Sequence, residues 1–86
     1  MERYQYLRSL ISQLLEDLPL LRTEVVEDVR YLMSVGEEEL AFETMCSWIY
    51  EDSLAISRQY YERLASVAQE IGSQRALHKL DELIEK

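Results

Sequence analysis

The sequence predicts an all-α protein, a compact bundle of four to five helices in which residues 1–86 form a single helical domain. Apolar residues recur every three or four positions along nearly the whole chain, which is the spacing of one face of a helix. The 86 residues include only two glycines and one proline, so turns are few. No stretch alternates apolar with polar residues in the way that predicts a strand.

Two helices are expected before residue 37, separated by Pro19. The apolar face of the first consists of Tyr4, Leu7, Ile11, Leu14, Leu15 and Leu18. This helix ends before Pro19, because a proline disfavours helical backbone in the residue that precedes it. The second helix has Thr23 as a candidate N-cap, and Gly36 either ends it or lies just before the next helix. Its apolar face is formed by Val25, Val26, Val29, Leu32 and Met33.

A third helix is expected from about Glu37 to Asp52, because three glutamates at residues 37–39 suit the positive end of a helix dipole. Its apolar face contains Leu40, Ala41, Met45, Trp48 and Ile49, with Phe42 and Cys46 beside it, so Trp48 is expected in the core. Ser57 is expected to cap a fourth helix, which ends at Gly72 and bears Tyr60, Tyr61, Leu64, Val67, Ala68 and Ile71. Ser73 is expected to cap a last helix with Leu77, Leu80, Leu83 and Ile84.

Negative charge is concentrated in one part of the chain, although the whole chain has a net charge of −8 from 17 acidic and 9 basic residues. Between Glu16 and Asp52, which we call the acidic segment, eleven acids are opposed only by Arg22 and Arg30. A surface of one sign attracts a partner of the opposite sign and repels phosphates. We therefore expect a basic protein as the partner, and neither nucleic acid nor a membrane surface. Solubility is the other role open to this charge.

Few residues are suited to chemistry. The only histidine, His78, has Asp81 and Glu82 one helical turn further on, but a metal site normally needs three or four ligands. Cys46 lies in an apolar stretch and is expected to be a small buried side chain. No glycine-rich phosphate loop, calcium loop or nucleophile elbow occurs. We expect no catalytic, cofactor-binding or metal-binding residue, and an enzyme that uses His78 is the weakest of the hypotheses.

The expected location is the cytoplasm. A single cysteine allows no intramolecular disulfide, which agrees with a reducing compartment. The first residues lack the basic and then apolar pattern of a signal peptide, and no apolar run approaches the roughly 20 residues that cross a bilayer.

The residues expected to contact a partner combine carboxylates with a tyrosine on and around the third helix. They are Glu37, Glu38, Glu43, Tyr50, Glu51 and Asp52. Amphipathic aromatic side chains beside charged groups are frequent anchors of protein interfaces. The acids of the second helix, Glu24 with Glu27 and Asp28, are expected to form a solvated face.

Residues 35–51, VGEEELAFETMCSWIYE, resemble the MafI-type immunity proteins, which are small acidic antitoxins paired with bacterial polymorphic toxins, including those of contact-dependent growth inhibition. The resemblance continues through Ile56, Ser57 and Tyr60 to Gly72 and covers roughly the middle and later half of the chain. The family pattern has an aromatic residue and a glycine where this chain has two glutamates at positions 38 and 39. The resemblance implies a cytoplasmic protein that binds a toxin domain and blocks it. Many such toxins are nucleases with basic substrate sites.

Two hypotheses for the function follow. In the first, the chain is an immunity protein that neutralises a cognate toxin domain, expected to be a nuclease, through its acidic surface. In the second, it is a helical adaptor or regulatory subunit that binds a basic partner protein unrelated to toxins. A homo-oligomer is compatible with both, because a helical bundle with exposed apolar residues can pair with itself.

Overall fold

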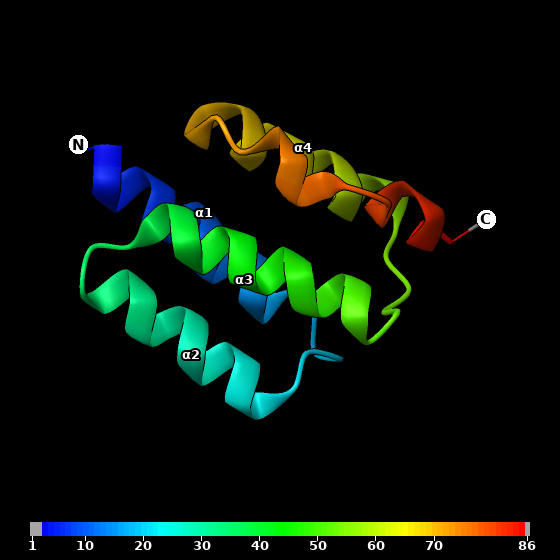
Figure 1. Ribbon diagram of the computed structural model, residues 1–86, viewed down its shortest axis with the longest axis horizontal. Coiled ribbons are helices and arrows are strands. Elements are labelled where there is room, and N and C mark those ends of the chain that lie inside the picture. Colours follow the sequence, from blue (N-terminus) through cyan, green and yellow to red (C-terminus); the bar gives the residue numbers. More distant parts are fainter. Residues whose placement is uncertain (1–2, 86) are drawn as a thin grey trace.

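The computed structural model describes residues 3–85 and contains four α-helices followed by two short 3-10 turns (Figure 1). The helices are α1 (Arg3–Glu16), α2 (Thr23–Ser34), α3 (Glu38–Glu51) and α4 (Arg58–Ile71), and the turns are η1 (Gln74–Leu77) and η2 (Leu80–Leu83). The predicted all-α bundle of four to five helices is confirmed. None of the described helices has the length and apolar character needed to cross a membrane.

Helix α3 is the central element of the bundle. It contacts α1, α2, η1 and η2, and Figure 1 shows it crossing the middle of the molecule between α2 and the C-terminal segment. Its buried apolar side chains are Ala41, Phe42, Met45, Cys46 and Ile49. They pack with buried residues of the other three helices in one continuous core. The opposite side of α3 is exposed to solvent and carries Glu39, Leu40, Ser47, Trp48, Tyr50 and Glu51.

Helices α2 and α3 form an antiparallel pair joined by a tight turn. Gly36 adopts a φ of 81°, a left-handed conformation that side-chain-bearing residues avoid. The amides of Gly36 and Glu37 donate to the carbonyl oxygens of Met33 and Leu32 at 3.1 and 2.8 Å. These two bonds satisfy carbonyl groups at the end of α2. The turn therefore places the two acidic helices side by side.

The prediction of a regular last helix is wrong. The segment instead forms η1 and η2, separated by His78 and Lys79, and the φ of Lys79 is 65°. Leu77, Leu80 and Leu83 are spaced by three residues. This spacing matches the three residues per turn of a 3-10 helix better than the 3.6 of an α-helix. With that geometry Leu80 is fully buried against the core.

The end of the described chain is held against the connection between α3 and α4. Ile56 and Ile84 form an isolated parallel β-bridge. The amide of Ile56 donates to the carbonyl oxygen of Leu83 at 3.1 Å, and the amide of Glu85 donates to the carbonyl oxygen of Ile56 at 2.7 Å. Together with η1 and η2, this bridge closes the side of the core that borders α3 and α4.

Of the N-caps predicted for α2 and α4, only the cap of α4 is observed. Ser57 caps α4 as predicted, because its hydroxyl oxygen accepts a hydrogen bond from the amide of Tyr60 at 3.0 Å. Thr23 does not cap α2. It is the first helical residue, and the cap position is held by Arg22 without a side-chain bond.

Tyr60 joins α4 to α1, which gives a testable contribution to stability. Its ring is buried and its hydroxyl donates to the carbonyl oxygen of Leu14 at 2.6 Å. Burial raises the pKa of Tyr60 far above the usual value of a tyrosine, so the hydroxyl stays a donor. Tyr60→Phe should lower the free energy of unfolding by about 1 kcal/mol, measured by urea unfolding. Tyr61→Phe, the same change at a half-buried neighbour, is the control, and equal losses would contradict a role for the bond.

Candidate protein-binding surface

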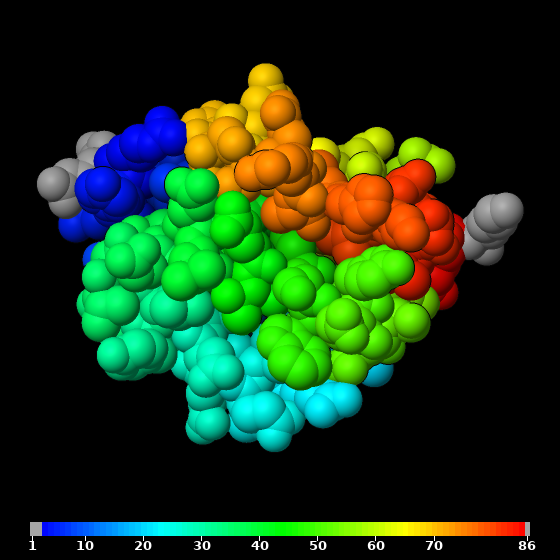
Figure 2. Space-filling model, viewed as in Figure 1, coloured from blue at the N-terminus to red at the C-terminus, as the bar shows by residue number. Residues whose placement is uncertain are grey.

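The outer sides of α2 and α3 combine carboxylates with aromatic and aliphatic side chains. We call this region the α2–α3 surface. Its exposed members are Glu24, Glu27, Asp28 and Tyr31 on α2, and Glu37, Leu40, Trp48 and Glu51 on or just before α3. Tyr50 is also exposed, but it lies about 200° around α3 from Trp48, on the side of Glu43 and Ser73. Figure 2 shows the face of the molecule on which α2 and α3 lie side by side, coloured from cyan to green.

Three acids and one tyrosine share the outer side of α2. Glu24, Glu27, Asp28 and Tyr31 follow the i, i+3, i+4, i+7 spacing of one helix face, and the tyrosine is 66% exposed. None of the three carboxylates pairs with an arginine or lysine within residues 3–85. These residues were not among the predicted contacts, because acid pairs on a helix are usually only solvated. Their spacing with Tyr31 was the signal in the sequence that could have found them.

The structure separates the six predicted contacts into two groups. Glu37, Tyr50 and Glu51 are exposed, whereas Glu38, Glu43 and Asp52 interact with other parts of the protein. Glu37 and Glu51 lie at opposite ends of α3, about 21 Å apart by the rise of a 14-residue helix. The predicted residues therefore do not gather in one small patch.

Glu38 departs most from the expectation of an exposed contact. Its side chain is only 3% exposed, and Oε1 accepts a hydrogen bond from Nε of Arg8 at 3.2 Å. Its second oxygen, Oε2, is buried and has no hydrogen-bond donor among the described residues. A buried acceptor without a donor costs about 1–3 kcal/mol, and more when it is charged. Glu38 thus lies inside the protein, and the burial of Oε2 without a hydrogen bond is unfavourable to folding.

Glu43 and Asp52 each stabilise a neighbouring segment. The hydroxyl oxygen of Ser73 lies 3.0 Å from Oε2 of Glu43 and 3.2 Å from Oε1 of Glu39, so its single proton serves one carboxylate at a time. Ser73 was predicted to cap a helix, and it pairs with α3 instead. Arg22 donates from Nε and Nη2 to both carboxylate oxygens of Asp52 at 2.8 and 3.0 Å. This bidentate pair joins the start of α2 to the end of α3.

Trp48 lies at the surface, and its predicted place in the core is wrong. The ring is 36% exposed, and the guanidinium carbon of Arg22 is 5.5 Å from its centroid, a cation–π distance. The core side of α3 is occupied by Phe42 and Ile49, and each residue turns the helix by about 100°. Trp48 therefore falls at the edge of the buried face. Leu40, also expected on that face, is 46% exposed.

Most of the acidic segment stays unpaired in the folded protein. Three of its eleven acids form ion pairs, namely Asp17 with Arg63 at 2.9 Å, Glu38 with Arg8 at 3.2 Å and Asp52 with Arg22 at 2.8 Å. The other eight do not pair with an arginine or lysine of residues 3–85, and they are Glu16, Glu24, Glu27, Asp28, Glu37, Glu39, Glu43 and Glu51. These carboxylates therefore give the surface of the folded protein a negative electrostatic potential.

The described part of the chain contains no cluster of metal-ligand side chains. No three His, Cys, Asp or Glu side chains within it lie together in a way that would hold a metal ion. His78 is exposed. Cys46 is buried, and burial, with a smaller contribution from the negative charge of Glu43, raises the pKa of its thiol to about 12. A thiol with that pKa supplies no nucleophile near neutral pH.

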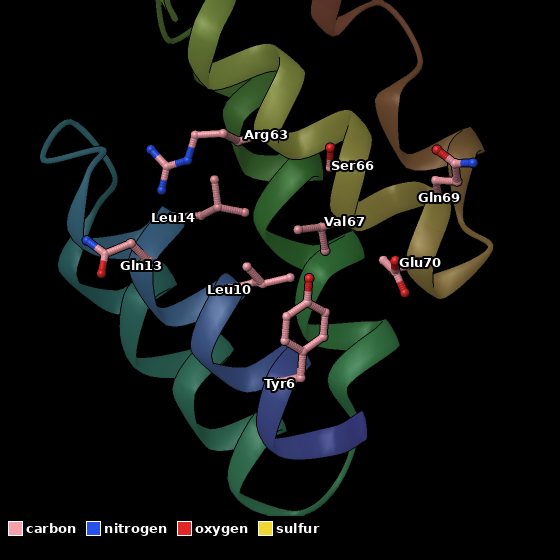
Figure 3. Close-up of a pocket in the computed structure, with 9 residues that line it drawn as sticks. All are labelled: Tyr6, Leu10, Gln13, Leu14, Arg63, Ser66, Val67, Gln69 and Glu70. Carbon is pink, nitrogen blue, oxygen red and sulfur yellow. The ribbon is translucent and has the colours of Figure 1, made fainter. Parts of the chain in front are cut away.

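A groove of about 320 Å³ lies between α1 and α4 (Figure 3). Leu10, Leu14 and Val67 form its apolar part, and Glu70 is the one carboxylate among the residues that line it. The lining contains neither histidine nor cysteine.

Comparisons of the chain with protein-family models, with curated proteins and with solved structures return no match. The fold and the α2–α3 surface define a small helical protein with an acidic, partly apolar face.

Proposed function

We propose that this protein is a cytoplasmic immunity protein that binds a cognate bacterial toxin domain and neutralises it by stoichiometric binding, without catalysing a reaction. The observation that carries the proposal is the α2–α3 surface, where exposed aromatic rings and carboxylates without an ion pair among residues 3–85 occur on the same two helices. A toxin that cleaves nucleic acid binds phosphates through a basic site. An acidic protein surface competes for such a site and repels other acidic molecules. The resemblance of residues 35–51 to the MafI-type immunity proteins supports the same function.

Exposed aromatic rings can lengthen the lifetime of a complex, which charge alone does not. Long-range attraction raises the rate of association, whereas the lifetime of a complex depends on side chains that lose water in the interface. Tyr31 and Trp48 are exposed aromatic residues of the α2–α3 surface. Trp48 is held by Arg22, and a side chain that is already fixed loses less conformational entropy on binding. These rings are the proposed anchors of the toxin.

The experiment that tests this function uses the product of the gene directly upstream, where the gene of a cognate toxin is expected. The purified toxin domain should form a one-to-one complex with this protein, and its activity should disappear at equimolar ratio. The variant with Tyr31→Ala and Trp48→Ala should lose affinity by about tenfold or more. Tyr6→Ala, at an exposed ring of α1 outside the α2–α3 surface, is the matched control and should keep full affinity. A toxin domain that stays fully active with excess protein would refute the proposal.

The adaptor hypothesis uses the same surface and is separated by the identity of the partner. A helical adaptor or regulatory subunit would present these carboxylates to a basic protein without toxic activity. Tight, salt-sensitive binding to a non-toxic product of the same operon, with no toxin gene upstream, would favour the adaptor.

A further inference from the structure

Two charged residues, one on each side of the junction between α2 and α3, occupy positions that their own helices disfavour. Arg22 is the N-cap residue of α2 and makes no side-chain cap bond, and Asp52 is the C-cap residue of α3. A helix dipole has its partial positive charge at the N-terminus and its partial negative charge at the C-terminus. Each side chain therefore has the same sign as the helix end that carries it, and local structure gives no reason for either charge.

The contacts of the two side chains connect them to Trp48. The two hydrogen bonds from Arg22 to Asp52, at 2.8 and 3.0 Å, fix the plane of the guanidinium. The same guanidinium lies over the ring of Trp48, with Cζ 5.5 Å from the centroid. The side chain of Arg22 is 56% exposed, and ion pairs with that much exposure generally contribute little to stability. Departures from local preference in natural proteins are concentrated at functional sites, so the contact with Trp48 is the stronger reason for this pair.

We propose that Asp52 is a positioning residue for Trp48 and acts through Arg22. Asp52 fixes the guanidinium, and the guanidinium restrains the indole, so the anchor is ordered before the partner arrives. A side chain that is fixed before association loses less conformational entropy in the complex. Asp52 also cancels the positive charge beside the anchor, which would otherwise repel a basic partner. The gain in affinity rests on the proposed function, whereas the ordering of the indole in the free protein does not.

The first experiment measures the mobility of the Trp48 indole in the free protein by NMR relaxation of its Nε1–H group. Asp52→Asn removes the charge and keeps the shape of the side chain, and the order parameter should fall from about 0.85, typical of rigid groups, toward about 0.6. Arg22→Lys keeps the net charge, loses the planar fork and should have the same effect, so it keeps the test valid if Asp52→Asn does not fold. Glu62→Gln and Arg30→Lys make the same two changes at exposed positions away from the pair. They are the matched controls and should leave the indole as ordered as in the wild type.

An indole that stays as ordered in the folded variants as in the wild type would overturn the proposal. Binding to the partner is measured separately, and Arg22→Lys should weaken the complex by about two- to tenfold. Because its net charge is unchanged, the loss should lie in faster dissociation, and it should vanish when Trp48→Ala is also present. If the indole becomes mobile but the affinity is unchanged, the positioning stands and its contribution to binding is refuted. If the product of the upstream gene does not bind the wild type, the toxin assignment fails, and the NMR result alone decides the role of Asp52.

Discussion

Phe42→Ala is expected to lower the free energy of unfolding by about 3–5 kcal/mol. The ring has no exposed surface and lies on the inner side of α3, the helix that contacts most other elements. Its removal leaves a cavity that surrounding side chains fill only in part. A domain of 86 residues has a total stability of roughly 4–13 kcal/mol, from about 0.05–0.15 kcal/mol per residue. The variant should therefore be close to unfolding at 25 °C.

Trp48→Ala is the matched comparison on the same helix. Its ring is partly in water and rests on Arg22, so truncation opens no closed cavity and should cost about 1–2 kcal/mol. Urea unfolding followed by circular dichroism measures both losses. A loss at Trp48 as large as the loss at Phe42 would show that the indole is a core residue, and the surface position described above would be wrong.

Reversing three charges on the α2–α3 surface is expected to slow association with a basic partner by about tenfold or more at low salt. The variant carries Glu27→Lys, Asp28→Lys and Glu51→Lys, all at exposed positions without an ion pair in the described chain. Glu43 is left unchanged because it accepts a hydrogen bond from Ser73. Wild-type association should slow as salt is added, because the Debye length is only about 8 Å at physiological ionic strength. The variant should show a much weaker salt dependence.

The control reverses three exposed acids outside the acidic segment, Glu62, Glu70 and Glu82, and changes the net charge by the same amount. Stopped-flow association rates of the two folded variants and the wild type are compared at several salt concentrations. If both variants slow equally, only the net charge matters. If neither slows, the acidic segment serves solubility alone, and the α2–α3 surface is not the binding site.

The helices and their inner faces were predictable because they depend on local spacing. The third helix was expected from about Glu37 to Asp52 and is observed from Glu38 to Glu51. A glycine after a periodic apolar stretch marks the end of a helix. Gly36 follows α2 in this way, and Gly72 follows α4. The spacing of apolar residues placed Trp48 in the core, which is wrong. A helix face defined by sequence spacing has no sharp edge, because a single residue turns the helix by about 100°.

The sequence did not predict which charged side chains form ion pairs or hydrogen bonds, because their partners belong to segments that are distant in the sequence. Arg8 reaches Glu38, Arg22 reaches Asp52 and Ser73 reaches Glu43, each across 30 residues. Hydrophobic periodicity says nothing about such pairs. Three of the six predicted contacts are engaged in this way, whereas the acids of α2 remain unpaired in the described chain.

The surface position of Trp48 also determines what the tryptophan fluorescence of this protein reports. It is the only tryptophan of the 86 residues, so the indole signal comes from one known site. Because only 36% of this residue is exposed in the folded state, its emission should move to longer wavelength when the chain unfolds. Docking of a partner on the α2–α3 surface would remove the remaining water from the ring and move the emission to shorter wavelength. A single optical signal from the unlabelled protein would then move in opposite directions on association and on loss of the fold.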